Sequence, residues 1–234
     1  MVRGNNASLK KLGYGVKGDL ERILDSRIPD CDFKYGTRRN VLDNYEAIRK
    51  DMYGPLREKL NGRDDGFLNC NPEEISLFYD SYKKTVYLMP QGDYMSVRKL
   101  KSCLAHELGH HLLATSIPEY HEKEAELFQE EARARLDERK DESRKYQELF
   151  REMKDSDEGF ADWCSLNYAK EKLPTQSYRT LVESTINRAF YPGNNIDRFV
   201  DFDDGATDAA DAKPKTKEEA FRVVRELAKA KESQ

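Results

Sequence analysis

The sequence predicts an α+β domain that is mostly helical and carries one small antiparallel sheet. Through most of its length, apolar side chains recur every three or four positions, which is the period of an amphipathic helix. Residues 74–90 instead form two short runs rich in β-branched and aromatic residues, which is typical of a β-hairpin. No stretch approaches the about 18 apolar residues of a membrane span, and the first residues lack the apolar core of a secretory signal.

The composition excludes several classes of protein. With 40 Lys+Arg against 44 Asp+Glu, the near-balanced charge gives no argument for binding nucleic acid or an anionic membrane. The four cysteines are widely spaced, so a disulfide framework and a cysteine-rich zinc module are not expected, and a reducing cytoplasm is the expected location. Histidine is scarce, yet three of the four histidines fall between His106 and His111.

The N-terminal region, residues 1–72, is predicted to be helical and to pack with the rest of the domain. The segments GDLERILDSRI and NVLDNYEAIRKDMYGPLREKL each place apolar side chains on one helical face. The second pattern is interrupted near Gly54-Pro55 and closed by Asn61-Gly62, both of which are turn signals.

The main core is predicted over residues 73–192. EISLFYD and TVYLMP form the hairpin, and a helix follows in which the buried face is built mainly of leucines (Val97, Leu100, Leu104, Leu108 and Leu112). Residues 119–155 are dominated by charged side chains with a thin apolar stripe, which predicts a solvated helix or helical hairpin. A further helix is expected from Asp157 to Lys172. Residues 193–215 resemble a flexible linker, and 216–234 a short amphipathic helix.

The segment that carries chemistry is His106-Glu107-Leu108-Gly109-His110, an HExxH motif. On a helix, residues four apart project from one face, about 5–6 Å from one another, so both imidazoles suit one zinc ion. Glu107 is one step round the helix, where a general base contacts water rather than the metal. The alternative is a solvated helix that carries two histidines by chance.

Catalytic zinc needs a third protein ligand, and Glu158 is the candidate that we favour. Glu158 and Asp162 lie four apart on one helical face, so a second helix crossing the first could bring Glu158 to the metal. Asp162 would then reach the far nitrogen of His106 or His110 and fix its orientation. His121 is the other histidine, but its charged surroundings suggest a solvent-facing position. Cys103 is expected to be a core cysteine, with a closing ligand as the alternative.

The order of these motifs resembles that of the ImmA/IrrE-like zinc metallopeptidases. A hairpin, the helix CLAHELGHHLL and a helix with EGFADW ending in AKEKLP carry the resemblance, over roughly residues 74–174. It implies a minimal zincin-like domain with the sheet packed on the HExxH helix, and makes 119–155 an insertion. It also implies His106, His110 and Glu158 as ligands, Glu107 as the base, and an intracellular protein substrate, commonly a transcriptional repressor.

The sequence therefore predicts a zinc-dependent peptidase, for which an exposed edge of TVYLM would align an extended protein or peptide substrate. Tyr168, Tyr178 and Arg179 are candidates for stabilising the oxyanion, and the sequence does not choose among them. Two alternatives stay open. One is a non-catalytic sensor or interaction protein stabilised by zinc, with a site closed by Cys103 or His121. The other is a zinc hydrolase that acts on a substrate other than protein.

Overall fold

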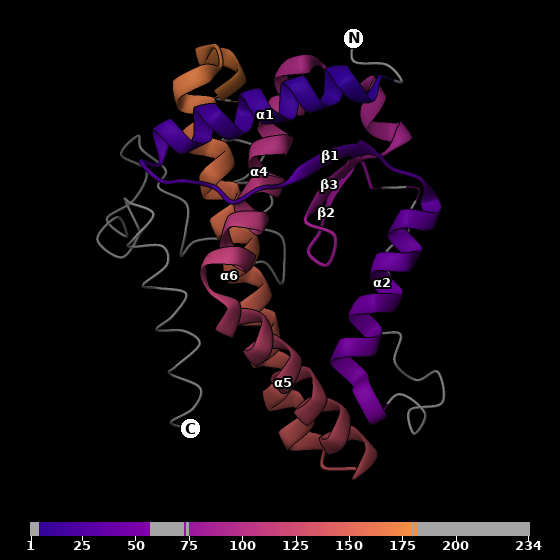
Figure 1. Ribbon diagram of the computed structural model, residues 1–234. Helices are drawn as coiled ribbons and strands as arrows, with labels where there is room; N and C mark the ends of the chain where they lie inside the picture. The colour runs from indigo at the N-terminus through magenta and orange to yellow at the C-terminus, as the bar shows by residue number, and fades with distance from the viewer. Residues whose placement is uncertain (1–4, 57–72, 74, 179, 182–234) are drawn as a thin grey trace, which may run out of the picture.

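The computed structural model describes residues 5–56, 73, 75–178, 180 and 181, and it confirms the α+β class (Figure 1). The predicted linker 193–215 and C-terminal helix 216–234 lie outside the described residues. The helices are α1 (Asn6–Ile23), α2 (Arg38–Tyr53), α4 (Val97–Ser116), α5 (Pro118–Leu136) and α6 (Lys140–Lys172), with 3₁₀ turns η1 (Gly54–Leu56) and η2 (Pro90–Tyr94). The strands are β1 (Asp32–Tyr35), β2 (Leu77–Asp80) and β3 (Thr85–Leu88). None of the helices described combines the length and apolar character of a membrane span.

The sheet has three strands in the order β1-β3-β2. β2 and β3 form the predicted antiparallel hairpin, with Leu77 opposite Leu88. β1 adds a parallel strand on the other side of β3, so the sheet is mixed rather than wholly antiparallel. Four residues are too few to show a strand period, and this strand lies inside the region predicted to be helical.

β3 is the central strand and is buried along its whole length. The prediction that TVYLM offers an exposed edge is therefore wrong, because β1 and β2 occupy both of its sides. The edge formed by β1 is closed by side chains. The backbone N–H groups of Phe33 and Tyr35 donate to Asp32 Oδ1 and Asn6 Oδ1, at 2.9 and 3.0 Å. Side chains that occupy edge donors prevent pairing with another strand.

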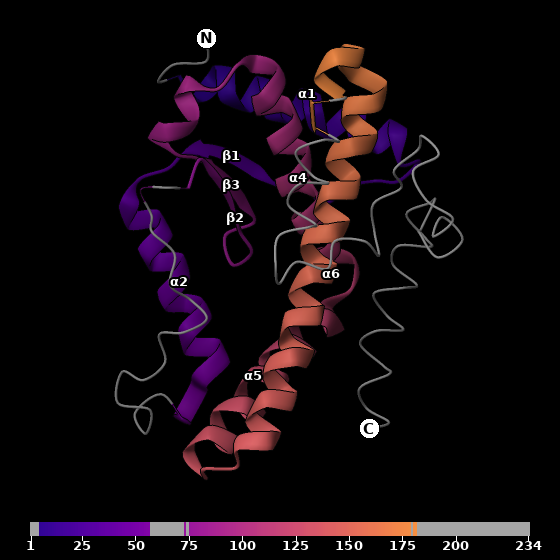
Figure 2. The same ribbon diagram turned by 180° about the vertical axis from the view of Figure 1, so that it is seen from behind.

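α4 lies between the sheet and α6, and α1 crosses both helices at one end of the molecule (Figures 1 and 2). The leucines of the predicted helix face, Leu100, Leu104, Leu108 and Leu112, are all buried in the main core. Phe160 and Trp163 of α6 and Phe33 of β1 join the same core. Burial of this apolar surface is what fixes α6 against the helix that carries HExxH.

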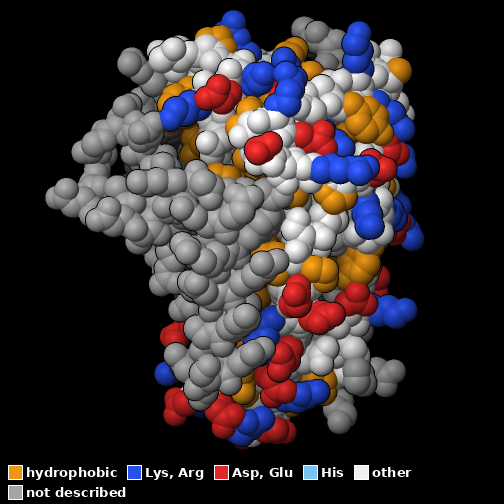
Figure 3. All heavy atoms as spheres, turned by 60° about the vertical axis from the view of Figure 1, so that its left-hand side comes forward, with side chains coloured by type: hydrophobic (Ala, Val, Ile, Leu, Met, Phe, Trp, Pro, Cys, Tyr) orange, Lys and Arg blue, Asp and Glu red, His pale blue; other side chains and the backbone are white. Residues whose placement is uncertain are grey.

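The charged segment forms α5 and the first half of α6, which pair as a helical hairpin that extends away from the sheet (Figure 2). Part of its thin apolar stripe is buried, because Phe128, Ala132 and Phe150 pack against Tyr53 of α2. Most of the charged side chains face solvent, although Glu124 and Glu131 are buried. Acidic and basic groups are interspersed over this end of the molecule (Figure 3). Interspersed charges of both signs are typical of a solvated helical surface.

Candidate metal centre

Two of the three histidines of helix α4, His106 and His110, face α6. The helix begins at the N-cap Ser96, whose side chain accepts a hydrogen bond from the Lys99 N–H, at 3.2 Å. Such a cap satisfies one of the otherwise unpaired N–H groups of the first turn. With the leucine face held in the core, His106 and His110 project from a neighbouring face, where their side chains are 17% and 15% exposed. Both imidazoles are thus shielded without being sealed from solvent.

Glu158 of α6 completes a group of three donor atoms with these histidines. The two Nε2 atoms are 3.1 Å apart, and Glu158 oxygens lie 3.4 Å from His106 Nε2 and 3.7 Å from His110 Nε2. Tetrahedral zinc, with ligands at about 2.0–2.1 Å, requires donor atoms about 3.4 Å from one another. The two Glu158 distances are to different oxygens, Oε2 and Oε1, and all three separations lie within about 0.3 Å of that value. The donor set could therefore hold one zinc ion.

Each histidine is oriented by a carboxylate at its other nitrogen. Asp162 Oδ1 lies 3.0 Å from Nδ1 of His106, which is one of the two contacts predicted for it. Asp157 Oδ1 lies 2.7 Å from Nδ1 of His110, and sequence reasoning assigned this residue no role. When each Nδ1–H donates to a carboxylate, both Nε2 atoms present lone pairs, which is the tautomer that binds a metal.

The electrostatics of the cluster are those of a cation site. Burial disfavours charge on His110, but Asp157 and Glu158 outweigh it and raise its pKa to about 9; the pKa of His106 is raised likewise by Asp162 and Glu158. Burial also opposes ionisation of Glu158, yet the two histidines lower its pKa to about 2. The carboxylates therefore hold protons on the imidazoles when no metal is bound. A metal cation that displaces those protons would balance the negative charge of the same carboxylates.

Glu107 differs from the other acids of the site. Burial raises its pKa, while the neighbouring His106 and His110 act in the opposite direction. Its carboxyl also accepts a hydrogen bond from the backbone N–H of Tyr79, on β2. A carboxylate with a raised pKa, held beside the donor group but outside it, is suited to take up and release a proton.

His111, the neighbour of His110, is fully buried and serves a different purpose. Its Nδ1 lies 2.8 Å from the Tyr79 hydroxyl and its Nε2 lies 3.1 Å from the Pro29 carbonyl oxygen. Nε2–H therefore donates to Pro29 while Nδ1 accepts from Tyr79, and burial lowers the pKa of the ring. A neutral His111 thus ties β2 and the chain before β1 to the HExxH helix.

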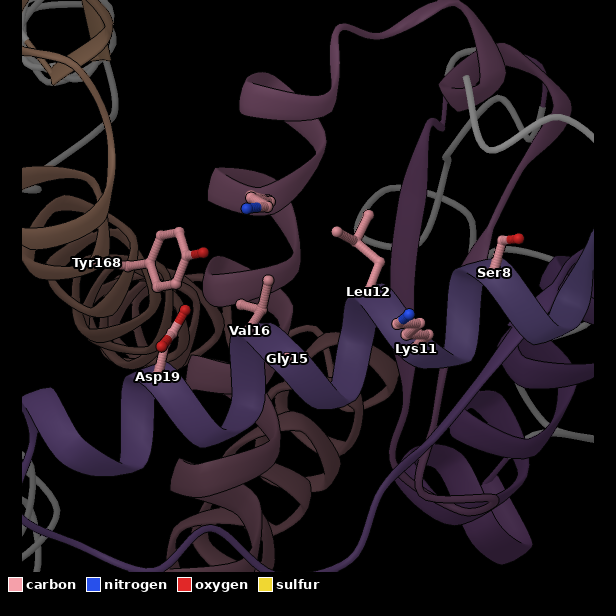
Figure 4. A pocket seen from close by; sticks show the side chains of 8 residues that line it. Ser8, Lys11, Leu12, Gly15, Val16, Asp19 and Tyr168 are labelled. Carbon is pink, nitrogen blue, oxygen red and sulfur yellow. The ribbon is translucent and has the colours of Figure 1, made fainter.

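The other candidate residues do not join the donor group. Cys103 is half-buried and packs against the main core, as expected of a core cysteine. The side chains of His121 and Arg179 lie outside those that the structure describes. Tyr168 lies ten residues beyond Glu158 on α6 and lines a separate pocket with residues of α1, including Val16 and Asp19 (Figure 4). Within the described side chains, the group that could hold a metal ion consists of His106, His110 and Glu158.

Gly109, between the two histidines, allows α4 and α6 to approach closely enough to form the site. A Cβ atom at this position would lie 2.7 Å from Ala161 Cα and 3.2 Å from Cys164 Cβ. The first contact, to backbone, is shorter than packed atoms allow, and the second is tight enough that Cys164 would have to shift by a few tenths of an ångström. The sequence contains this signal, since a glycine inside a strongly helical segment usually has a packing reason.

We expect Gly109→Ala to lower the free energy of unfolding by about 1–3 kcal/mol, because α6 must move away from α4. The same shift separates Glu158 from the histidines, so zinc affinity should fall as well. Denaturant unfolding and competition with a chromophoric chelator measure the two effects. Gly18→Ala on α1 is the matched control, since a Cβ there meets nothing within 4 Å and should be neutral or slightly stabilising. Equal behaviour of the two variants would contradict the close-packing argument.

Comparison of the chain with protein-family models, with curated proteins and with solved structures yields no match.

Proposed function

We propose that this protein is a zinc-dependent metallopeptidase of the type that the ImmA/IrrE-like resemblance implies. The observation that carries the proposal is the donor group of His106, His110 and Glu158, with Glu107 beside it. Two histidines and one carboxylate form the ligand set of many catalytic zinc sites, which keep a fourth position open. The half-exposed side chain of Glu158 supports such an open position, because it leaves the donor group reachable from solvent.

Zinc in such a site would act as a Lewis acid that polarises a carbonyl group and lowers the pKa of water to about 7. His106, His110 and Glu158 would hold the ion. Asp162 and Asp157 keep the two imidazoles in the tautomer that presents Nε2. Because the carboxylate of Glu158 stays ionised over the physiological range, it is available as a ligand without losing a proton.

Glu107 is the proposed general base. It would take a proton from the attacking water and pass it to the leaving amine, which requires a carboxylate of raised pKa close to the reacting atoms. The backbone N–H of Tyr79 orients this carboxylate, so β2 and the base are held together. That link holds the edge of β2 next to Glu107.

β2 is the strand proposed to align the substrate. The Met89 N–H donates to the Ser76 carbonyl, so alternate residues from Ser76 onward pair with β3. The main-chain groups of Leu77 and Tyr79 then point to the outer side of β2, toward the base. An extended peptide that adds to this edge through main-chain hydrogen bonds would lie across the metal site. The outward N–H of Tyr79 is held by Glu107, so the pairing would use the outward groups of Leu77 and the carbonyl of Tyr79. On β1 side chains occupy the outward N–H groups of both Phe33 and Tyr35, which supports the choice of β2.

The substrate class follows from the resemblance and from the chemistry of an extended backbone. We propose a protein in the cytoplasm, with a transcriptional repressor as the expected kind. Recognition through main-chain groups would be sequence-tolerant, so specificity would come from side-chain pockets at alternate positions.

Metal removal tests the proposal directly. The purified chain is expected to hold about one equivalent of zinc, as measured by plasma mass spectrometry. Cleavage of a proteome-derived peptide library, which tolerates narrow specificity, should stop after treatment with 1,10-phenanthroline and return with added zinc. Cleavage that persists in metal-free protein would contradict the proposal. A zinc-loaded chain that cleaves no peptide would favour the non-catalytic sensor instead.

A further inference from the structure

We propose that Lys154 and Glu124 position Asp157 on His110, and that helix α5 is thereby part of the metal centre. This inference rests on the proposed metal-binding function, because it concerns how one ligand is held. Lys154 Nζ lies 3.3 Å from Asp157 Oδ2 and 3.0 Å from Glu124 Oε1. The other oxygen of Asp157 contacts His110 Nδ1 at 2.7 Å. The four side chains form a continuous ionic chain from α5 to the proposed metal ligand, in the order Glu124, Lys154, Asp157 and His110. We call this chain the relay.

The two carboxylates of this chain are buried and need a counter-charge. Glu124 is 4% and Asp157 is 8% exposed. Buried carboxylates are costly unless they are paired and hydrogen-bonded. Lys154 contacts both, and although its partial burial opposes its charge, Glu124 and Asp157 outweigh this effect and raise its pKa. A single ammonium group thus supports two acids from two different helices.

The relay solves a problem of like charges. Asp157 is adjacent to Glu158 in sequence, so two carboxylates approach His110 from the same turn of α6. Without Lys154, the Asp157 carboxylate would be repelled by Glu158 and by Glu124, and it would turn away from His110. That movement releases the imidazole of His110 from its metal-binding orientation.

The two histidine ligands are therefore supported differently. Asp162, which orients His106, is 3% exposed and lies on the α6 turn that packs against α4 in the main core. Asp157, which orients His110, depends on Lys154 and on Glu124 of the charged hairpin. A disturbance of α5 should therefore act on His110 and leave His106 in place.

The first test compares zinc affinity among variants of Lys154. Lys154→Met removes the charge and keeps the length of the stem, and it should weaken zinc binding by about 10–100-fold, the usual effect of losing an outer partner of a ligand. Lys154→Arg should restore most of the affinity. Lys145→Met, at an exposed position of the same helix, is the control and should bind zinc as the wild type does. Competition with a chromophoric chelator at fixed pH gives the dissociation constants, and Tm is recorded for each metal-free chain.

The second test asks whether Lys154 acts through Asp157. If it does, Lys154→Met should cause no further loss of zinc affinity in an Asp157→Asn background, so the two effects are non-additive. Glu124→Gln, on α5, should weaken zinc binding in the same direction and serves if Lys154→Met does not fold. A general structural role would instead lower Tm in every variant and would show additive losses.

The outcomes separate the relay from the proposed function. Wild-type zinc affinity in both Lys154→Met and Glu124→Gln, or fully additive losses with Asp157→Asn, would overturn the relay. A wild-type chain that binds zinc and responds to these variants, yet cleaves no peptide, would overturn the peptidase and leave the relay standing. A wild-type chain that binds no zinc would overturn both.

Discussion

Glu107→Gln is expected to keep its zinc and to lower kcat/KM for peptide hydrolysis by about 10²–10⁴-fold, the usual contribution of a positioned general base. Glutamine has nearly the same shape and can still accept the hydrogen bond from the Tyr79 N–H, so β2 should stay in place. It cannot take a proton from water. Metal content by mass spectrometry and initial rates on a library-derived peptide measure the two properties on the same sample.

The control for this variant is Glu171→Gln, an exposed position near the end of α6, which should change neither zinc content nor rate. Loss of zinc in Glu107→Gln would mean that Glu107 is a ligand rather than the base. Unchanged turnover would exclude it as the base. A non-catalytic zinc protein would show no turnover in either chain, so the variant also separates an enzyme from a zinc-stabilised sensor.

Glu158→Ala is expected to lose most of its bound zinc, and with it all peptide cleavage. One of the three donors disappears, so the loss of affinity should exceed the about 10–100-fold expected of an outer partner. Half of the Glu158 side chain is exposed, and the core residues of α6 lie on another face, so the metal-free chain should still fold. Chelator competition measures the affinity, and circular dichroism with thermal unfolding reports on the fold.

Glu148→Ala is the matched control, because Glu148 is exposed on the same helix two turns or more before the site. It should bind zinc and cleave peptide as the wild type does. Full zinc occupancy together with full activity in Glu158→Ala would remove Glu158 from the ligand set. That result would favour the alternative of a zinc site completed by Cys103 or His121.

The pair of histidines and the third-ligand candidate could be predicted because their information is local. Two histidines four residues apart share a helical face whatever the rest of the chain does, and so do Glu158 and Asp162. The leucine face of α4 and the alternation in the hairpin are likewise properties of short segments. The α+β class follows from these periods, and the structure confirms it.

The assignments that failed or were missing depend on contacts between distant segments. β1 is recognisable only from its parallel pairing with β3. That pairing makes TVYLM the central strand, with β1 and β2 as the two edge strands. Asp157 stands next to Glu158 among many charged residues, and nothing in its sequence neighbourhood distinguishes it from them. Its contact with His110 arises from the close approach of α6 to α4, which Gly109 permits.

The sequence by itself thus determined which residues share one face of a helix. Helical geometry repeats every 3.6 residues, so this does not depend on what the helix packs against. The sequence determined the HExxH face, the ExxxD face and the hairpin. Tertiary packing alone decided which carboxylate contacts which histidine, which strand lies at the centre of the sheet, and that Glu124 of the charged hairpin contacts Lys154, which in turn contacts Asp157. Those choices depend on how the helices and strands lie relative to one another, which buried apolar surface and close backbone contacts set.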